Sequence, residues 1–341
     1  MKAVIMAGGE GKRLKPVSGR TPKPMVKLLG KPMMEHIIEL LRYNGFCDIC
    51  CALKYRAGDI IGHFGDGRDF GVNLSYSIES EPLGTAGAVK NCRDFYGKED
   101  FLVISGDAAC DFNLRELMHA HTESRASATI ALHRDSEPLE YGLAVTDENN
   151  LIKAFIEKPS WSRVVTDLVN TGIYVLSPAV MENVPAGQAY DFGNDLFPKL
   201  LKNGDKLLGL PLEGYWCDVG NPLSYYKCCV DALEGKLKIR PGGEFLPKDS
   251  TAEPENVENC SVSLDCPCRS RARLMGALSE ALLSMDADYS DGIRLERPHF
   301  SLHISPLAND SSLRIAVSSY NEEYAAELAE SAKELAEAFN L

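Results

Sequence analysis

The glycine-rich segment after the first apolar run constrains this chain more than any other feature. Residues 3–6 are apolar and are followed directly by Ala7-Gly8-Gly9-Glu10-Gly11-Lys12-Arg13. Glycines let backbone N–H groups approach an anion closely, and Arg13 and Lys23 add two fixed positive charges. The segment therefore predicts a phosphate site at the end of a buried strand. The alternative is that the glycines form only a tight turn.

The spacing of this segment disfavours two common nucleotide-binding motifs. Arg13 follows Lys12 where a P-loop would have serine or threonine. Leu14 stands where the dinucleotide-binding fingerprint would have its third glycine. Neither an ordinary P-loop ATPase nor a nicotinamide-dependent enzyme is favoured.

Apolar runs alternate with helical patterns over the first two hundred residues. The helical patterns cover residues 33–43 and 114–122. Strands separated by helices predict a doubly wound, mostly parallel α/β sheet. Ligands bind beyond the carboxyl ends of the strands in such sheets, so the glycine segment and Asp107 are expected there. The predicted strands are residues 3–6, 48–53, 74–77, 101–105, 128–132, 143–145 and 172–176.

The pattern changes after residue 235. Scattered prolines and glycines predict neither helix nor sheet across residues 236–268. We therefore predict an α/β domain at residues 1–235, a linker at 236–269 and a small α+β domain at 270–341. Within the last domain, residues 271–285 and 322–339 are expected to be helices and residues 292–295, 300–304 and 313–317 strands.

The final helix carries a row of acidic residues at helical spacing. We expect this face to be solvated, because charge runs on a helix usually face water. A domain of about seventy residues has a marginal core and would gain stability from docking elsewhere. The acidic residues are Glu323, Glu327, Glu330, Glu334 and Glu337.

Composition narrows the class of protein further. The net charge of −13 disfavours a general nucleic-acid surface, which needs a basic face. No apolar run is long enough to predict a membrane span. The chain has 11 cysteines, an odd number, and no secretory signal, so we expect a reduced, cytoplasmic setting. Cys260, Cys266 and Cys268 lack a C-x-x-C pair and are expected to be free thiols rather than zinc ligands.

Several motifs occur in the order found in one enzyme family. Together they resemble the sugar-phosphate nucleotidyltransferases over about residues 1–235. That resemblance implies a Rossmann-like nucleotidyltransferase domain. The motifs are Gly8-Gly9-Glu10-Gly11-Lys12-Arg13-Leu14, Pro22-Lys23-Pro24, Gly84-Thr85-Ala86-Gly87, Gly106-Asp107, Glu157-Lys158-Pro159, Asn170-Thr171-Gly172 and Trp216-Cys217-Asp218-Val219-Gly220.

The resemblance also implies an activity and its residues. A nucleoside triphosphate would transfer its nucleotidyl group to a sugar 1-phosphate and release pyrophosphate. Catalysis is implied for Arg13, Lys23, Asp107 and Asp218, with the two aspartates holding Mg²⁺. Nucleotide binding is implied for Ala7, Gly8, Gly9, Gly11, Glu79, Gly84 and Thr85, and sugar-phosphate binding for Gly142, Glu157, Lys158, Asn170 and Thr171.

The choice of substrates rests on one loop. Residues 82–87 resemble the guanylyltransferases that make GDP-mannose, and the Glu79 carboxylate could accept from guanine N1–H and N2–H₂ together. GTP and mannose 1-phosphate are therefore the expected pair. The alternatives are a glucose-1-phosphate uridylyl- or thymidylyltransferase, a noncatalytic sugar-nucleotide-sensing subunit, and an enzyme that activates phosphocholine or aminoethylphosphonate. The intact charged residues argue against a sensor, and Glu157-Lys158-Pro159 favours a sugar. A homo-oligomer is compatible with all of these.

The last seventy residues resemble the final domain of the phosphohexomutases. In an active mutase this domain carries an R-P-S-G-T-E-P phosphate loop, whereas residues 304–312 here read I-S-P-L-A-N-D-S-S. The arginine and glycine of that loop are missing, and no phosphoserine or metal loop occurs elsewhere in the chain. The resemblance therefore implies a catalytically incomplete module that serves packing, oligomerisation or regulation.

Overall fold

The computed structural model describes residues 1–14, 21–238, 258–266, 268–282, 287–289, 292–297, 300–307, 312–319 and 322–339. The chain forms two compact units. The first contains Met1–Glu10 and Met34–Trp216, and the second contains Gly11–Met33 and Cys217–Leu341. Parts of the predicted linker, of the helix expected at 271–285 and of the altered phosphate loop lie outside the described residues.

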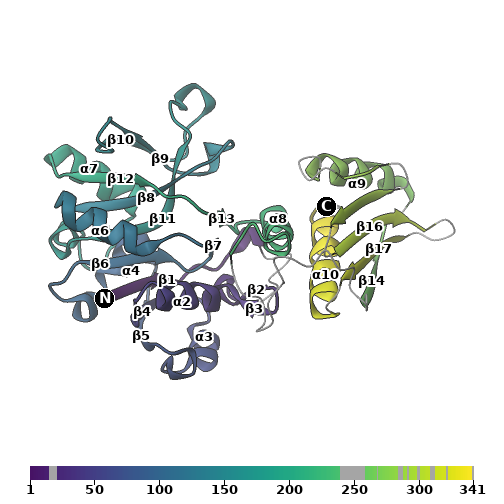
Figure 1. Cartoon of the computed structure of the whole chain (residues 1–341), viewed down its shortest axis with the longest axis horizontal. Coiled ribbons are helices and arrows are strands. Elements are labelled where there is room, and N and C mark those ends of the chain that lie inside the picture. The colour runs from purple at the N-terminus through teal and green to yellow at the C-terminus, as the bar shows by residue number, and fades with distance from the viewer. Residues whose placement is uncertain are drawn as a thin grey trace. The chain divides into compact units, whose positions relative to one another are not determined.

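The first unit contains the predicted parallel sheet (Figure 1). Four strands lie in the order β6-β1-β4-β5 and are parallel to one another. Ala3, Val4 and Ile5 are fully buried in the middle of this sheet, because strands covered on both faces are apolar throughout. The bounds are β1 Lys2–Met6, β4 Asp48–Leu53, β5 Asn73–Ile78 and β6 Phe101–Ser105.

Beyond β6 the sheet continues with an antiparallel strand. β11 runs antiparallel to β6 and also pairs with β8 and β9. The register of β11 against β8 shifts between Asn170 and Tyr174. Before the shift Val169 also pairs with β9, and after it residues 173–176 also pair with β6. The remaining strands of this part are β8 Ala128–Arg134, β9 Leu143–Thr146, β10 Ile152–Ile156, β11 Leu168–Leu176 and β12 Leu207–Pro211.

Helices connect the strands, as the sequence pattern predicts. The helix Met33–Tyr43 has the predicted bounds, and α6 continues two residues past the predicted end, to Ser124. No helix of the described part of the chain is both long and apolar enough to cross a membrane. The helices of this part are α2 Met33–Tyr43, α3 Ala57–Phe64, α4 Gly84–Lys90, α5 Arg93–Tyr96, α6 Leu114–Ser124 and α7 Phe197–Asn203, and the short strand β7 spans Ala108–Cys110.

The second unit begins with a small hairpin and a helix. The strands β2 and β3 pair antiparallel through the turn at Leu29 and Gly30. Helix α8 starts with a capping box, in which the Asn221 side chain accepts from the Ser224 N–H. The bounds are β2 Lys27–Leu28, β3 Lys31–Pro32, β13 Trp216–Asp218 and α8 Pro222–Leu233.

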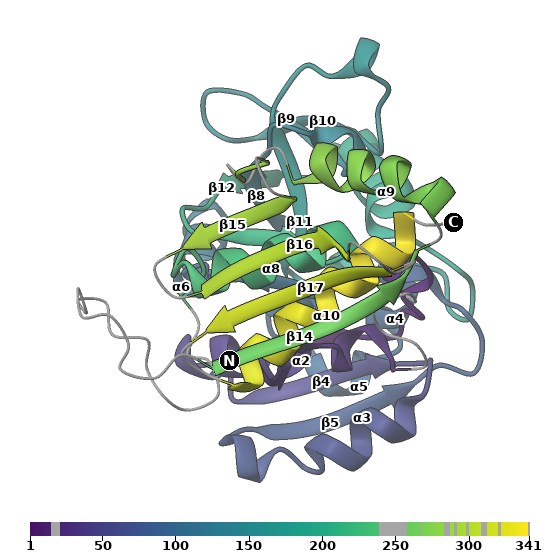
Figure 2. The same ribbon diagram turned by 90° about the vertical axis from the view of Figure 1, so that its right-hand side faces the viewer.

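The C-terminal part of this unit is an antiparallel sheet with helix α10 against it (Figure 2). Its strands lie in the order β14-β17-β16-β15. The side chains of Leu302, Ile315 and Leu328 are almost fully buried in its core. The bounds are β14 Glu258–Asp265, α9 Cys268–Ala281, β15 Ile293–Arg297, β16 Phe300–Pro306, β17 Ser312–Ser319 and α10 Glu322–Phe339.

One sequence-based expectation for the linker is wrong. Glu258–Asp265 lies within residues 236–269, for which no regular structure is expected, yet it forms β14 and pairs with β17 along its whole length. The signal was present, because Cys260, Val262 and Leu264 alternate with polar residues at the period of a strand. The sheet therefore has four strands where the sequence predicts three.

The expectation of a fully solvated acidic face on the last helix is also wrong, because Glu327 and Glu334 are only partly exposed. Glu327 is partly buried and accepts hydrogen bonds from the N–H groups of Leu29 and Gly30. In contrast, Glu330 is exposed and pairs with Lys333, as a solvated face predicts. Tertiary contacts, which helical periodicity does not report, decide which acidic residue faces water.

Candidate active site

In the first unit, a glycine and two charged residues lie just after the carboxyl ends of three parallel strands. Gly8 follows β1, Lys54 follows β4 and Glu79 follows β5. A Cβ at Gly8 would lie 3.2 Å from Glu79 Oε1 and 3.4 Å from Lys54 Cβ, so a larger residue would press against the Glu79 carboxylate. Ala7 is buried and its N–H donates to Ala52 O at 2.9 Å, which fixes the start of the loop.

Glu79 is held beside the loop that the sequence assigns to nucleotide binding. Its Oε2 accepts from the Leu83 N–H at 3.0 Å. Burial raises the pKa of Glu79, while the Leu83 N–H and Lys54 act in the opposite direction. A Cβ at Gly9 would meet no described atom within 4 Å, so the backbone beside Gly8 stays open to a ligand.

Asp107 follows β6 at the same edge of the sheet. Its Oδ1 accepts from the Ser105 hydroxyl at 2.6 Å. The N–H of Gly106 donates to Met6 O at 2.8 Å, which ties the ends of β6 and β1 together. These contacts agree with the prediction that the glycine segment and Asp107 lie together at the carboxyl ends of the strands. The agreement concerns only the residues of the segment up to Glu10, because those from Gly11 onward belong to the second unit.

The start of α4 lies against the backbone of Tyr190. Gly84 has φ +68°, and a Cβ there would lie 2.8 Å from Tyr190 O. The N–H groups of Ala86 and Gly87 both donate to Tyr190 O, at 2.9 Å and 3.0 Å. The small residues of this motif are therefore required by close backbone approach.

Thr85 links this motif to a segment that sequence reasoning missed. Its N–H and its hydroxyl both donate to Asp191 Oδ1, each at 3.0 Å. The N–H of Phe192 donates to Thr85 Oγ1 at 3.0 Å. The predicted nucleotide loop is thus bonded directly to residues 191–192.

A cavity of about 420 Å³ lies beside this link. It brings together four residues predicted from the sequence with five that were not. For the additional residues at 191–194, the available signal was a glycine in a short stretch that also holds Asp191 and Asn194. No regular pattern placed this stretch near the predicted residues. The predicted residues are Thr85, Glu157, Lys158 and Asn170, and the additional ones are Tyr174, Asp191, Phe192, Gly193 and Asn194.

Two neighbouring glycines leave the space that the Glu157 carboxylate occupies in this cavity. A Cβ at Gly193 would lie 2.5 Å from Glu157 Oε2, and one at Gly142 would lie 2.7 Å from it. Burial raises the pKa of Glu157, Lys158 lowers it and Asp191 raises it. Gly142 therefore contributes space for the carboxylate.

Asn170 and its neighbour have different roles. The Asn170 N–H donates to Gly142 O at 2.7 Å, and its side-chain amide donates to Tyr174 Oη at 3.0 Å. Thr171 is only 2% exposed, and its hydroxyl donates to Ala131 O at 2.7 Å. The Thr171 side chain therefore fastens β11 to β8 and is not among the residues that line the cavity.

The second unit brings together three of the four predicted catalytic residues. Lys23 is 8% exposed, and its Nζ lies 3.1 Å from Asp218 Oδ1. Gly11 has φ +65°, and a Cβ there would lie 2.8 Å from Lys23 Cβ. A Cβ at Gly220 would lie 3.1 Å from Asp218 Oδ2 and 3.3 Å from Arg13 Nη2. Glycines thus let two cations and a carboxylate approach closely.

The two carboxylates that the family resemblance assigns to a metal ion belong to different units. Asp107 belongs to the first unit and Asp218 to the second. Among the described residues, no group of three or more histidine, cysteine, aspartate or glutamate side chains could hold a metal ion. A carboxylate completed by phosphate oxygens suits Mg²⁺, so each aspartate by itself has the chemistry of a ligand for an ion that binds together with a nucleotide.

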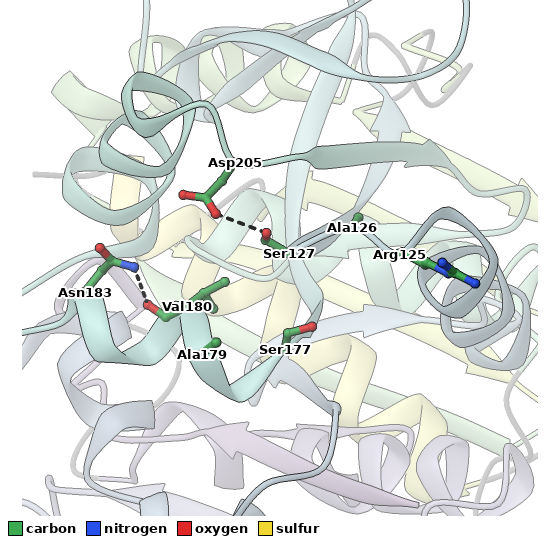
Figure 3. A pocket seen from close by; sticks show the side chains of 8 residues that line it. All are labelled: Arg125, Ala126, Ser127, Ser177, Ala179, Val180, Asn183 and Asp205. Atoms are coloured by element: carbon green, nitrogen blue, oxygen red, sulfur yellow. Dashed lines mark hydrogen bonds between the residues drawn. The ribbon is translucent and has the colours of Figure 1, made fainter.

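A second, smaller cavity of about 180 Å³ lies at the other edge of the first unit's sheet (Figure 3). It is lined by residues next to the starts of β8 and β12 and the end of β11. Inside it, Ser127 Oγ donates to Asp205 Oδ1 at 3.1 Å. None of the predicted site residues lines this cavity.

Comparison with known proteins identifies the family. A model of the nucleotidyl transferase family matches residues 2–235, and the chain belongs to this family. A UTP–glucose-1-phosphate uridylyltransferase from Synechocystis is 36% identical over 279 residues, which cover 76% of this chain and 72% of that protein. A mannose-1-phosphate guanyltransferase from Pichia angusta is 36% identical over 230 residues, 66% of this chain and 62% of that protein.

A solved structure is similar as well. HddC from Yersinia pseudotuberculosis, crystallised with GMP-PN, is 32% identical with a TM-score of 0.59 and covers 68% of this chain and 99% of its own. The chain is therefore an enzyme of the nucleotidyl transferase family, and enzymes of this family generally use a divalent metal ion. The family match ends before residues 270–341, so their resemblance to phosphohexomutases stays a prediction.

Proposed function

We propose that this protein transfers a guanylyl group from GTP to mannose 1-phosphate and releases pyrophosphate. The observation that carries the proposal is the double hydrogen bond from Thr85 to Asp191, because it joins the nucleotide motif to the cavity around Glu157. A nucleotide held by one side of this junction and a sugar held by the other would be neighbours. Proximity of that kind accounts for much of the rate of a two-substrate reaction.

The reaction needs charge neutralisation rather than covalent chemistry from the protein. An oxygen of the sugar phosphate attacks the α-phosphorus in line, and the bond from that phosphorus to the bridging oxygen of the pyrophosphate breaks. Arg13 and Lys23 would offset charge on the triphosphate and on the departing pyrophosphate. Asp107 and Asp218 would hold Mg²⁺, which would neutralise further phosphate charge when bound.

Sugar and base recognition would each use a carboxylate. Glu157 as the anion can accept from two neighbouring sugar hydroxyls, and Lys158 would meet the sugar phosphate. Glu79 could accept from guanine N1–H and N2–H₂ together. The Leu83 N–H bonded to Glu79 Oε2 restricts how that carboxylate turns, which supports a role in orienting a base.

The cellular setting is a further proposal. The ten cysteines whose side chains the structure describes are free thiols, which supports a reducing compartment such as the cytoplasm. Assembly into a homo-oligomer stays a prediction.

Pyrophosphate release tests the proposal most directly. Each nucleoside triphosphate is combined with mannose 1-phosphate and with glucose 1-phosphate at saturating Mg²⁺. We expect the highest kcat/KM for GTP with mannose 1-phosphate. A higher value for UTP or dTTP with glucose 1-phosphate would identify the alternative activity, which the uridylyltransferase from Synechocystis makes the second candidate.

A binding assay separates an enzyme from a sensor. A ligand at a hundred times its Kd stabilises a fold by about 2.7 kcal/mol, which thermal unfolding detects. Stabilisation by a nucleoside triphosphate without turnover in any combination would favour the noncatalytic alternative.

A further inference from the structure

The turn between β2 and β3 is held by a side chain from the far end of the chain. The Leu29 N–H donates to Glu327 Oε1 at 2.8 Å, and the Gly30 N–H donates to Glu327 Oε2 at 2.7 Å. Leu29 has φ +51° and Gly30 has φ +82°, so two successive N–H groups point toward one anion. Both oxygens of the carboxylate are used in this contact.

Helix α8 meets the same carboxylate. The Tyr225 hydroxyl donates to Lys27 O at 2.8 Å and lies 3.3 Å from Glu327 Oε1. Burial raises the pKa of Glu327, while the N–H groups of Gly30 and Leu29 act in the opposite direction. The turn, α8 and α10 are therefore joined at one partly buried anion.

The C-terminal part has a second attachment to α8. Arg297 of β15 forms an ion pair with Glu234, just after the end of α8. Helix α10 also packs along α8, on which Tyr226 is fully buried. The Glu327 contact is thus part of a packed junction and not an isolated surface pair.

The two elements that Glu327 joins lead directly to the phosphate-handling residues. Lys23 is the first residue of a 3-10 turn, Lys23–Met25, which ends just before the β2–β3 hairpin. Asp218 precedes α8, and the Gly220 N–H donates to Ser224 Oγ at 3.0 Å, so the connection is bonded to the first turn of the helix. Displacement of either element would change how Lys23 meets Asp218.

We propose that Glu327 is a positioning residue through which the C-terminal part aligns Lys23 with Asp218 for triphosphate binding. The proposal rests on the proposed function, because it assigns the triphosphate to this ion pair. Glu327 acts indirectly, through its hydrogen bonds with the turn and with Tyr225. The C-terminal part thereby gains a role in the nucleotidyl transfer without chemistry of its own.

The first test compares Glu327→Gln with Glu330→Gln in the full chain. Glu330 lies on the same helix but is exposed and pairs with Lys333. We expect Glu327→Gln to raise KM for the nucleoside triphosphate about tenfold, since an amide offers one acceptor to two donors. KM for the sugar 1-phosphate and both values for Glu330→Gln should stay unchanged. A partial loss of folded enzyme would lower kcat and leave both KM values unchanged.

A double-mutant cycle tests whether the effect passes through Lys23. In a Lys23→Ala background, Glu327→Gln should no longer change KM for the triphosphate. If Glu327→Gln alone leaves this KM unchanged, or if the two substitutions are fully additive, the proposal is overturned. Tyr225→Phe removes only a hydroxyl and should give a smaller rise of the same kind, which covers the case that Glu327→Gln does not fold.

Amide hydrogen exchange supplies a readout that does not depend on activity. The amides of Leu29 and Gly30 should lose protection in Glu327→Gln and keep it in Glu330→Gln. Unchanged protection would overturn the proposal even if the enzyme is fully active. If the wild-type protein releases no pyrophosphate with any substrate pair, the proposed function fails, and the exchange result still decides whether Glu327 anchors the turn.

Discussion

The two candidate regions, one in each unit, are built by different means. Around Lys23 and Asp218, charged side chains meet directly, and glycines serve to bring them close. Around Glu157 and Thr85, backbone hydrogen bonds and two glycines shape a cavity for one partly buried carboxylate. The difference suggests that charge serves the triphosphate chemistry common to the family, whereas shape and hydrogen bonds serve discrimination between substrates.

The two constructions also tolerate change differently. Removing one partner of the Lys23–Asp218 ion pair leaves the other charge unpaired, at a cost below the about 3–5 kcal/mol of a fully buried pair because the Asp218 side chain is 30% exposed. Changing a group in an open polar cavity costs mainly its own contacts, about 1–3 kcal/mol for hydrogen bonds to a charge. Substitutions in the first group should therefore lower turnover with every substrate pair, and those in the second should change the preference between substrates.

The largest expected effect comes from the carboxylates implied to hold the metal. Asp218→Asn and Asp107→Asn should each leave the fold intact and lower pyrophosphate release by about 10²–10³-fold, since a charged ligand is lost. Steady-state rates at saturating Mg²⁺ measure the effect, and Asp147→Asn, whose carboxylate pairs with Lys153 on the surface, is the control. Near-normal turnover in either variant would refute the assignment of that residue.

A smaller effect is expected in the cavity. Glu157→Gln should raise KM for the sugar 1-phosphate by about 10–100-fold, because the amide accepts fewer hydrogen bonds from hydroxyls than the anion. KM for the triphosphate should stay the same. The exposed Glu148 offers the matched control Glu148→Gln. If Glu157→Gln changed KM for the triphosphate instead, the division between the two regions would be wrong.

The sequence predicts the strongly patterned parts of this molecule. The strands Asp48–Leu53 and Phe101–Ser105 and the helix Met33–Tyr43 have their predicted bounds, because long apolar patterns determine local structure reliably. Lys23 and Asp218 form an ion pair although they are far apart in sequence. The ordered family motifs imply that both residues are catalytic, but they do not predict that the two side chains pair with each other.

Contacts without a local pattern are what the sequence does not reveal. Asp191 joins Thr85 from a stretch with no strand or helix signal. Glu327 belongs to a regular acidic row, yet it is the residue that turns to Leu29 and Gly30. In both cases the partner is more than a hundred residues away, so spacing along the chain holds no information about it.

Base preference should change by a smaller factor than sugar binding. Glu79→Gln should lower the ratio of kcat/KM for GTP to that for UTP by about tenfold, since one of two acceptors for guanine is lost. Competition between the two nucleotides in one reaction measures this ratio. An unchanged ratio would show that Glu79 has no part in reading the base. Glu81→Gln, two residues along the same loop and exposed, is the control.

The smallest expected effect concerns stability in the C-terminal part, far in sequence from either substrate region. Burial, together with Glu330 and Glu337, raises the pKa of Glu334 to about 8, against the opposing effect of Lys333. The folded state then binds this proton more tightly than the unfolded state does, so stability falls as pH rises from about 4.5 to about 8.

Glu334→Gln removes this dependence on pH and tests its sign. The variant should be more stable than the wild type at pH 9 by about 1 kcal/mol, a value reduced for the partial exposure of the side chain. The difference should disappear below about pH 4.5, where the wild-type carboxyl is protonated in both states. Thermal unfolding at the two pH values measures it, with Glu296→Gln on the exposed face of β15 as control. A destabilised variant at pH 9 would mean that the charged form of Glu334 is favoured in the folded protein.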